Sequence, residues 1–442
     1  MKKIIFLMIL VFLSVLIFSA NSDDDELKDL SEKYAAAVLT GNFDAISAAL
    51  DAKMKEVVTK EKLTQALDVI KFQVGELKKR TFQKIVKNSD YNVILYKCEY
   101  EKINLLFSLT LNGKNEISGF HFTPFKDETT LNLKETDKFS EKTINFGSTD
   151  WPLPGILTTP KGTGPFPFVI LVHGSGPHDY DETIGPSKIF RDIAWGLAEK
   201  GIGILRYSKR TYVYTEKLSK VLPEITVMEE TVDDAVLAID FLKNQEKVEA
   251  KKIFVLGHSL GAMMIPKIAG LAPAAAGFIM MASPARPLED LILEQYNYIF
   301  NLDGKIDKNE KTELEKLIKQ VAIVKSKDLM TGTKADDLLF GAPYSYWIFL
   351  KNYSQRDEAI KINRPVYFAL GGRDYQVTEV DLKLWEKYLT GKNNFTFKLY
   401  PNLNHLFAEG KKKSTPDEYL KENKVSLSFI NDIADWIANN KK

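Results

Sequence analysis

Residues 257–261 read Gly-His-Ser-Leu-Gly, the spacing of a serine nucleophile on a tight turn. An apolar, β-rich run at 252–256 comes directly before them, and a helical pattern follows at once. The two glycines remove side chains that would clash across the turn, so the hydroxyl of Ser259 should project above the strand end. The backbone N–H of Leu260, at the helix start, would then face a developing oxyanion. The pattern predicts acyl transfer with Ser259 as nucleophile.

A second glycine-rich turn follows an earlier apolar run. Residues 172–177 read Val-His-Gly-Ser-Gly-Pro and end the β-rich segment 166–172. Such a turn brings another backbone N–H to the nucleophile, and we expect this second oxyanion donor to be the N–H of Ser175. We expect His173 to hold the loop through its imidazole.

A serine hydroxyl needs a base within hydrogen-bond reach. Of the five histidines, one lies in a separate N-terminal region, two belong to the oxyanion turn, and one is directed away from the serine by the turn that they share. His121 is the one in the N-terminal region, His173 and His178 are the two in the oxyanion turn, and His258 is the one beside the serine. The remaining candidate is His405, in a loop after the last predicted strand.

The third member of a triad fixes the tautomer of the base and stabilises its charged form. Asp374 follows the apolar run 366–370 and a Gly-Gly pair, so it should stand at a strand end. The order Ser259, Asp374, His405 is one in which this triad occurs. Alternatively, Asp374 caps a helix predicted over 378–389. Its place after the glycines favours the triad, and Asp381, one turn inside that helix, is expected to be solvated.

The elements that must position these residues are those of an α/β domain over 140–442. Short apolar runs alternate with amphipathic helical patterns, which predicts a mostly parallel sheet with helices on both faces. The predicted strands are 166–172, 203–206, 252–256, 277–281, 366–370 and 395–399. About 80 residues of helical pattern, 284–363, separate two of them. A connection of that length is usually functional, and we interpret it as a cap over the site.

Residues 25–125 predict a small N-terminal α+β domain. A helical period runs to about residue 80, and strand alternation follows to 125, with Asn112-Gly113 as a turn signal. A polar joint, 126–142, separates it from the α/β domain. The only cysteine, Cys98, excludes an internal disulfide or a cysteine metal cage, and we expect it to be buried.

The first 22 residues have the order of a secretory signal peptide. Two lysines precede an apolar run at 4–18, and small residues at 20 and 22 fit a cleavage site. An uncleaved membrane anchor is the alternative, but the run is shorter than the roughly 20 residues that a spanning helix needs. Both interpretations place the catalytic part outside the cytoplasm, secreted or in the cell envelope.

The composition excludes several classes of protein. With 442 residues, 45% hydrophobic and 27% charged, the chain is globular rather than disordered. The formal net charge is +1 and the basic residues are scattered among acidic ones, so nucleic acid is not an expected partner.

Four stretches carry a family resemblance: 173–182, 205–210, 371–377 and 403–407. They read His-Gly-Ser-Gly-Pro-His-Asp-Tyr-Asp-Glu, Leu-Arg-Tyr-Ser-Lys-Arg, Gly-Gly-Arg-Asp-Tyr-Gln-Val and Leu-Asn-His-Leu-Phe. Residues 140–440 thereby resemble the α/β-hydrolase superfamily and, more narrowly, bacterial exported carboxylesterases of the EstD type, which carry a small N-terminal domain of unknown function. The resemblance implies hydrolysis of short-chain acyl esters, no metal or cofactor, and a helical cap between the sixth and seventh strands. Ser208 stands where relatives often have Asp.

We therefore expect an exported serine carboxylesterase that acts on small-molecule acyl esters through an acyl-enzyme. A serine aminopeptidase or amidase with the same triad is one alternative, because a triad does not choose between ester and amide. A cap cluster of Glu289, Asp290 and Glu294 could bind a free amine, although these residues also fit the polar face of a helix. Another alternative is a cell-envelope binding protein with a vestigial hydrolase domain. The sequence leaves the natural substrate and the oligomeric state open.

Overall fold

The computed structural model describes residues 22–440 except 88–89, 102–103, 126–132, 220–224, 328 and 331. The predicted signal segment, apart from its last residue, lies outside the described residues. The chain divides into two compact units between residues 131 and 132, inside the polar joint expected at 126–142. Among the helices of the described part, none is long and apolar enough to cross a membrane.

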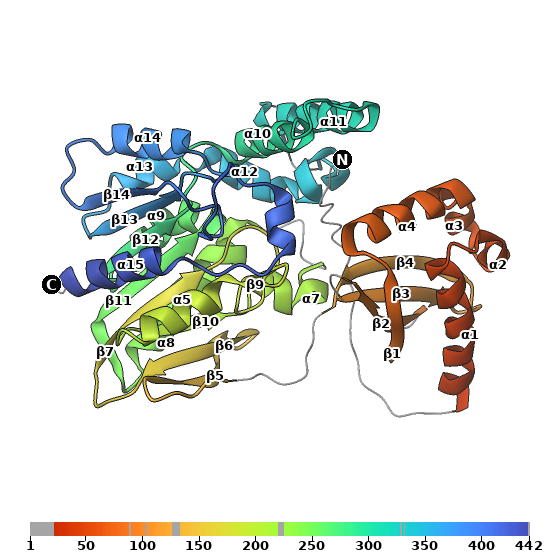
Figure 1. The fold of residues 1–442 in the computed structure, drawn as a ribbon, viewed down its shortest axis with the longest axis horizontal. Coiled ribbons are helices and arrows are strands. Elements are labelled where there is room, and N and C mark those ends of the chain that lie inside the picture. Colours follow the sequence, from red (N-terminus) through yellow and green to blue (C-terminus); the bar gives the residue numbers. More distant parts are fainter. Residues whose placement is uncertain are drawn as a thin grey trace. The chain divides into compact units, whose positions relative to one another are not determined.

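The N-terminal unit is a set of four helices followed by a four-stranded antiparallel sheet in the order β1-β2-β3-β4 (Figure 1). Its elements are α1 (Ser22–Leu39), α2 (Phe43–Ser47), α3 (Ala52–Val57), α4 (Lys60–Val74), β1 (Leu77–Lys87), β2 (Tyr91–Tyr100), β3 (Asn104–Asn112) and β4 (Ile117–Pro124). The helical pattern was expected to reach residue 80, but α4 ends earlier because Gly75 caps it with a φ of 83°.

The core of this unit lies between the helices and one face of the sheet. Alternate residues of β2, Ile94, Tyr96 and Cys98, are fully buried in it, as the two-residue period of a strand requires. Burial raises the pKa of the Cys98 thiol to about 12, so the thiol is protonated and unreactive, as expected from the sequence.

The second unit contains an eight-stranded sheet in the order β14-β13-β12-β11-β7-β10-β6-β5. In this order the six strands from β14 to β10, which include β7, are parallel to one another. Strands β5 and β6 form an antiparallel hairpin, and β6 pairs with β10 in the antiparallel sense. The strands are β5 (Phe139–Ser148), β6 (Trp151–Pro160), β7 (Phe166–Val172), β10 (Gly203–Tyr207), β11 (Val248–His258), β12 (Gly277–Met281), β13 (Val366–Gly371) and β14 (Phe395–Tyr400). The sheet is mostly parallel, as predicted, but the sequence pattern did not reveal β5 and β6.

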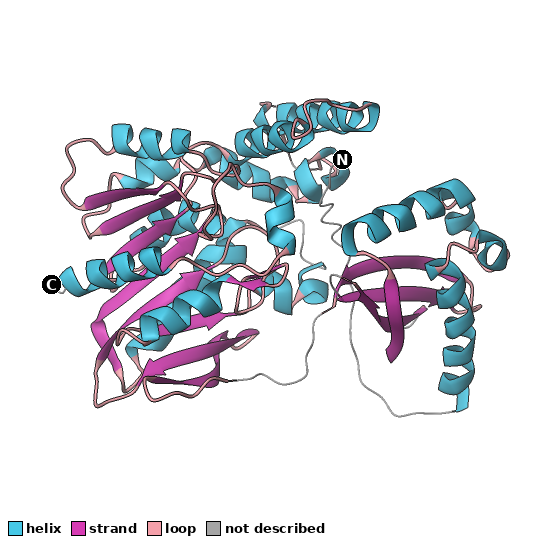
Figure 2. Cartoon of the chain, in the orientation of Figure 1, coloured by secondary structure: helices cyan, strands magenta, loops and turns pink. Residues whose placement is uncertain are grey.

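Helices cover both faces of this sheet (Figure 2). On one face lie α8 (Asp233–Lys243), α9 (Leu260–Leu271) and α14 (Glu379–Tyr388), and on the other α5 (Ile189–Ala198) and α15 (Leu427–Asn439). The burial of β7 on both faces explains why its sequence is apolar throughout. Phe168 and Ile170 belong to the core under α8, α9 and α14, and Val169 and Leu171 belong to the core under α5 and α15. A strand buried on both faces has no polar side to alternate with. The predicted α/β architecture is confirmed.

The interval between β12 and β13 is helical. It contains α10 (Leu288–Phe300), α11 (Lys308–Lys325), α12 (Tyr344–Asn352) and α13 (Gln355–Ala359), with two short 3₁₀ turns between α11 and α12. Phe300, on α10, and Trp347, on α12, are buried, and Trp347 belongs to the same core as α8 and α9.

Asp381, on α14, is fully buried and was wrongly expected to be solvated. Its carboxylate accepts hydrogen bonds from the backbone N–H groups of Ala285 and Arg286, at 3.0 and 3.1 Å, and pairs with the Arg286 guanidinium at 2.8 Å. The residue therefore fixes the segment by which the chain enters the cap.

Candidate active site

Ser259 occupies a strained turn between β11 and α9. Its φ of 52° and ψ of −113° lie outside the regions that residues with a side chain favour, and its N–H donates to the carbonyl of Met281 at 2.9 Å. A Cβ added to Gly257 would lie 2.5 Å from the carbonyl oxygen of Gly261, and one added to Gly261 would lie 2.4 Å from that of Val172. Both positions therefore require glycine, which is the reason inferred from the sequence.

Residues 173–188, called the oxyanion loop after the role predicted for Ser175, pass beside this turn. A Cβ added to Gly174 would lie only 3.3 Å from the Cβ of Ser259. Lys209 donates to the carbonyls of Gly174 and Gly176 at 2.8 and 3.1 Å. The His178 Nε2 donates to the carbonyl of Ser175 at 2.8 Å. The peptide groups around Ser175 are thus held in place next to Ser259, while Leu260 is the first residue of α9.

Two imidazoles in this loop are neutral. Burial lowers the pKa of His173 to about 3, and burial lowers that of His178 as well. The His173 Nε2 donates to the carbonyl of Asp179 at 2.9 Å. Its role is to hold the loop, as the sequence suggested.

His405 and Asp374 form a buried pair. The Nδ1 of His405 lies 2.6 Å from Oδ2 of Asp374, and the other carboxylate oxygen accepts the N–H groups of Gln376 and Val377 at 2.7 and 3.0 Å. Because a carboxylate only accepts, Nδ1 carries the hydrogen and Nε2 is left as a proton acceptor. The N-cap residue of α14 is Thr378, so Asp374 does not cap that helix.

A second histidine joins the loops that carry Ser259 and His405. His258 precedes Ser259, and its ring centroid lies 4.8 Å from that of His405. Its Nε2 donates to the carbonyl of His405 at 3.1 Å, and its Nδ1 lies 3.0 Å from Oε2 of Glu182. The other oxygen of Glu182 accepts the N–H of Gly174 at 2.7 Å.

This linking role of Glu182 and His258 was not predicted from the sequence. Burial alone would raise the pKa of Glu182, but the charge and hydrogen bond of His258 lower it to about 2. Burial likewise opposes the charge of His258, and Glu182 nevertheless raises its pKa. The only sequence signal was that both residues fall inside the short motifs around the turns.

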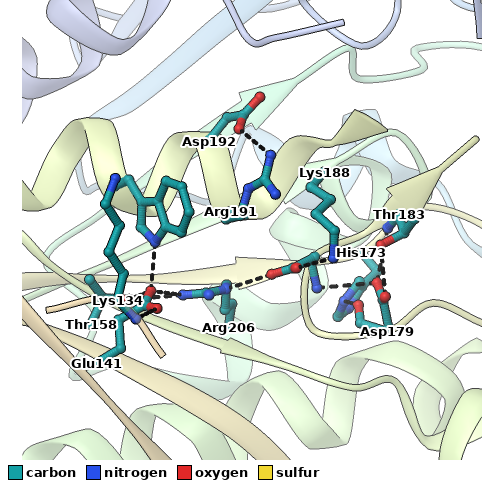
Figure 3. Close-up of polar contacts among 12 residues, drawn as sticks. Lys134, Glu141, Thr158, His173, Asp179, Thr183, Lys188, Arg191, Asp192 and Arg206 are labelled. Carbon is teal, nitrogen blue, oxygen red and sulfur yellow. Dashed lines mark hydrogen bonds and ion pairs between the residues drawn. The ribbon is translucent and has the colours of Figure 1, made fainter. Parts of the chain in front are cut away.

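The oxyanion loop is tied to the hairpin side of the sheet by Arg206 of β10 (Figure 3). Its guanidinium donates to Glu141 and Thr158, both at 2.8 Å, and to Asp181 of the loop at 2.9 Å. The side chains of Arg206, Glu141 and Asp181 are at most 5% exposed. Buried charges are tolerated when they are paired in this way, so the role of Arg206 is structural.

The cap contacts the segment that carries Asp374. From α10, the hydroxyl of Tyr298 donates to the carbonyl of Ser414 at 2.9 Å, and its ring stacks on that of Tyr375 at 5.2 Å. Gln295 donates to the carbonyl of Gln376 at 3.2 Å. The helical insertion thus lies against one side of the candidate site. In the described ranges, no group of three His, Cys, Asp or Glu side chains could hold a metal ion.

Comparison with known proteins identifies the family. Residues 164–410 match the family described as "Serine aminopeptidase, S33", and residues 31–120 match "Protein of unknown function (DUF3887)". Esterase EstD of Thermotoga maritima is 36% identical over 432 residues, which cover 97% of this chain and 98% of EstD. The chain belongs to the EstD family of α/β-hydrolase esterases. The predicted resemblance and the predicted fold are confirmed, and the chain is a serine hydrolase.

Two further similarities are more distant. Acylamino-acid-releasing enzyme 1 of Oryza sativa subsp. japonica is 27% identical over 143 residues, 32% of this chain and 17% of that enzyme. The structure of Est1E from Butyrivibrio proteoclasticus has a TM-score of 0.44 and 16% identity, and the match covers 67% of this chain and 98% of Est1E.

Proposed function

We propose that this protein is a carboxylesterase that hydrolyses small acyl esters through an acyl-enzyme intermediate formed on Ser259. The observation that carries the proposal is the buried contact of 2.6 Å between His405 and Asp374. It leaves Nε2 of His405 as the proton acceptor of a site whose serine occupies a strained turn. EstD is an esterase that is similar to this chain over nearly its whole length, and this similarity supports ester chemistry.

In this mechanism Ser259 attacks the ester carbonyl while His405 Nε2 takes the hydroxyl proton. Asp374 stabilises the imidazolium that results, and the N–H groups of Leu260 and Ser175 hold the negative oxygen of the tetrahedral intermediate. His405 then returns the proton to the alcohol that leaves. Water attacks the acyl-enzyme with His405 again as base, which releases the carboxylic acid and restores the serine.

The carboxylates of the cap argue for an ester rather than a peptide with a free amino end. Glu294 is paired with Arg286, and Asp290 with Lys325. Glu289 is buried, and burial raises the pKa of its carboxyl. None of the three is therefore arranged to bind an ammonium group. Turnover of an acyl ester should exceed that of an aminoacyl anilide, and the reverse preference would favour an aminopeptidase.

The test of catalysis is Ser259→Ala. We expect this variant to lose turnover of a short-chain p-nitrophenyl ester while its circular dichroism spectrum stays that of the wild type. Ser428→Ala, which changes an exposed serine at the start of α15, is the control and should keep full activity. Undiminished hydrolysis by Ser259→Ala would refute the proposal.

We also propose that the protein is exported, on the pattern of residues 1–22. Amino-terminal sequencing of protein from the cell envelope or medium should give a chain that begins at residue 23 or 21. A chain that keeps residue 1 and sediments with membranes would instead indicate an uncleaved anchor, and protein confined to the cytoplasm would contradict export.

A further inference from the structure

The second histidine–carboxylate pair, Glu182 with His258, spans the three segments that make up the candidate site. Glu182 is 0% and His258 1% exposed. Glu182 accepts the N–H of Gly174 in the oxyanion loop at 2.7 Å, and His258 donates to the carbonyl of His405 at 3.1 Å. The two side chains lie 3.0 Å from each other, and His258 directly precedes Ser259 in the chain. Neither side chain has a step of its own in the proposed reaction.

The hydrogen-bond partners fix the number of protons in this pair. The carbonyl of His405 can only accept, so Nε2 of His258 carries a hydrogen. The N–H of Gly174 can only donate, so Oε1 of Glu182 accepts. One further proton must bridge Nδ1 of His258 and Oε2 of Glu182. The pair as a whole is therefore neutral and holds a single shared proton, which sits on the imidazole because Glu182 is the stronger acid.

We propose that Glu182 and His258 are positioning residues which couple the oxyanion loop to the loop of the base, and that their shared proton makes this coupling sensitive to alkaline pH. The inference rests on the proposed esterase function. When the shared proton is lost, one remaining N–H of His258 must serve two acceptors, the carboxylate and the His405 carbonyl. One link then opens, and the geometry between Ser175 and His405 loosens.

Four titratable or charged groups lie around the Glu182–His258 pair. His173 and His178, from the same loop, are kept neutral by burial, which lowers the pKa of each. Lys209, from the segment after β10, donates to the Gly174 carbonyl and to Glu230. Asp374, after β13, is the negative group on the side of His405. Among these groups, only the Glu182–His258 pair is hydrogen-bonded both to Gly174 in the oxyanion loop and to the carbonyl of His405.

Glu182→Gln separates a pH-sensitive coupling from a merely structural contact. The amide oxygen can accept the N–H of Gly174 and the amide nitrogen can donate to Nδ1 of His258, whose Nε2–H still reaches His405. All three contacts remain, but no proton is shared. We expect kcat of the wild type to fall at alkaline pH, and we expect this variant to keep most of the wild-type kcat at neutral pH and to lose that fall.

Glu182→Ala removes the links instead of the proton. It should lower kcat by about 100-fold at every pH, the loss typical of a misplaced oxyanion donor, with a smaller change in KM. Asp234→Asn is the matched control. Its buried carboxylate pairs with Arg210, and we expect the variant to be less stable but to keep the pH profile of the wild type.

Nuclear magnetic resonance of the full chain labelled with ¹⁵N-histidine tests the shared proton without enzymatic activity. His258→Asn identifies the resonances. In the wild type at neutral pH both ring nitrogens of His258 should be protonated, and in Glu182→Gln only Nε2 should be. Identical ring-nitrogen shifts, or identical kcat profiles, in the two proteins would overturn the inference. A wild type that hydrolyses no ester would overturn the proposed function instead, and the spectra would still decide the location of the proton.

Discussion

The rings of His258 and His405, 147 residues apart in the chain, lie 4.8 Å apart, and the first donates a hydrogen bond to the carbonyl of the second. This contact joins the turn that carries Ser259 to the loop that carries His405. Each loop also has its own support, since Glu182 holds the first and Asp374 the second. The site is therefore fixed from both sides before any substrate binds, as preorganised catalysis requires.

Asp374→Asn should abolish most of the activity and leave the fold intact. The N–H groups of Gln376 and Val377 need an acceptor, so the amide oxygen stays with them and the amide nitrogen faces His405. The imidazole then carries its hydrogen on Nε2 and cannot take the serine proton. We expect kcat to fall by about 10⁴-fold, measured with a p-nitrophenyl ester, with an unchanged melting temperature. A loss below tenfold would show that this tautomer does not matter.

Gly261→Ala should destabilise the protein and reduce its activity. The added Cβ meets the carbonyl oxygen of Val172 at 2.4 Å, and backbone atoms cannot move aside cheaply. A cost of about 1 to 3 kcal/mol is usual for such overpacking, and urea unfolding measures it. Gly270→Ala, on the same helix with nothing within 4 Å of the added atom, is the control and should stabilise by about 0.5 to 1 kcal/mol. Equal effects of the two variants would contradict the elbow geometry.

Asp381→Ala should loosen the entrance of the cap. The change removes the acceptor of two backbone N–H groups and the partner of Arg286, and bonds to a charged acceptor contribute about 1.5 to 3 kcal/mol each. We expect a lower free energy of unfolding and a raised KM with a smaller change in kcat. Lys383→Ala, from an exposed pair on the same helix, should change stability by about 0.5 kcal/mol or less. A wild-type KM in Asp381→Ala would argue that the cap entrance does not shape substrate binding.

Stability should fall as the solution becomes acidic. The pKa of buried His173 is lowered to about 3 from 6.5, so below pH 6.5 the unfolded chain takes up a proton that the folded chain refuses. Although burial alone would raise the pKa of Glu182, its interaction with His258 lowers it to about 2 from 4.5, which adds a further loss below pH 4.5. Urea unfolding at several pH values between about 7 and 4 should show this slope, and His173→Gln should flatten its upper part. A slope that is the same in both proteins would place the acid sensitivity elsewhere.

The sequence predicted those parts of the fold that local pattern determines. The apolar runs marked β7 and β12 to the residue, because strands buried on both faces consist of apolar residues alone. The hairpin of β5 and β6 escaped notice because β5 alternates polar residues such as Glu141 with apolar ones and β6 contains prolines at 152 and 154. Prolines and polar alternation are typical of edge strands and of loops alike.

The supporting residues of the site could not be predicted in the same way. Glu182 and His258 are 76 residues apart, and nothing in the sequence of either segment indicates that the two side chains interact. Asp381 was expected to be a solvated acid one turn inside a helix, and only the approach of the chain after β12 buries it. Pairings of this kind depend on which loops meet at the sheet edge, which the spacing of residues along the chain does not state.

The most direct test of the central claim is the site of covalent labelling by a fluorophosphonate. After reaction of the full chain with the probe, mass spectrometry of its peptides should find one adduct, on Ser259, and Asp374→Asn should slow its formation. An unlabelled chain that still hydrolyses esters, or an adduct on a different serine, would contradict the assignment of Ser259 as the nucleophile.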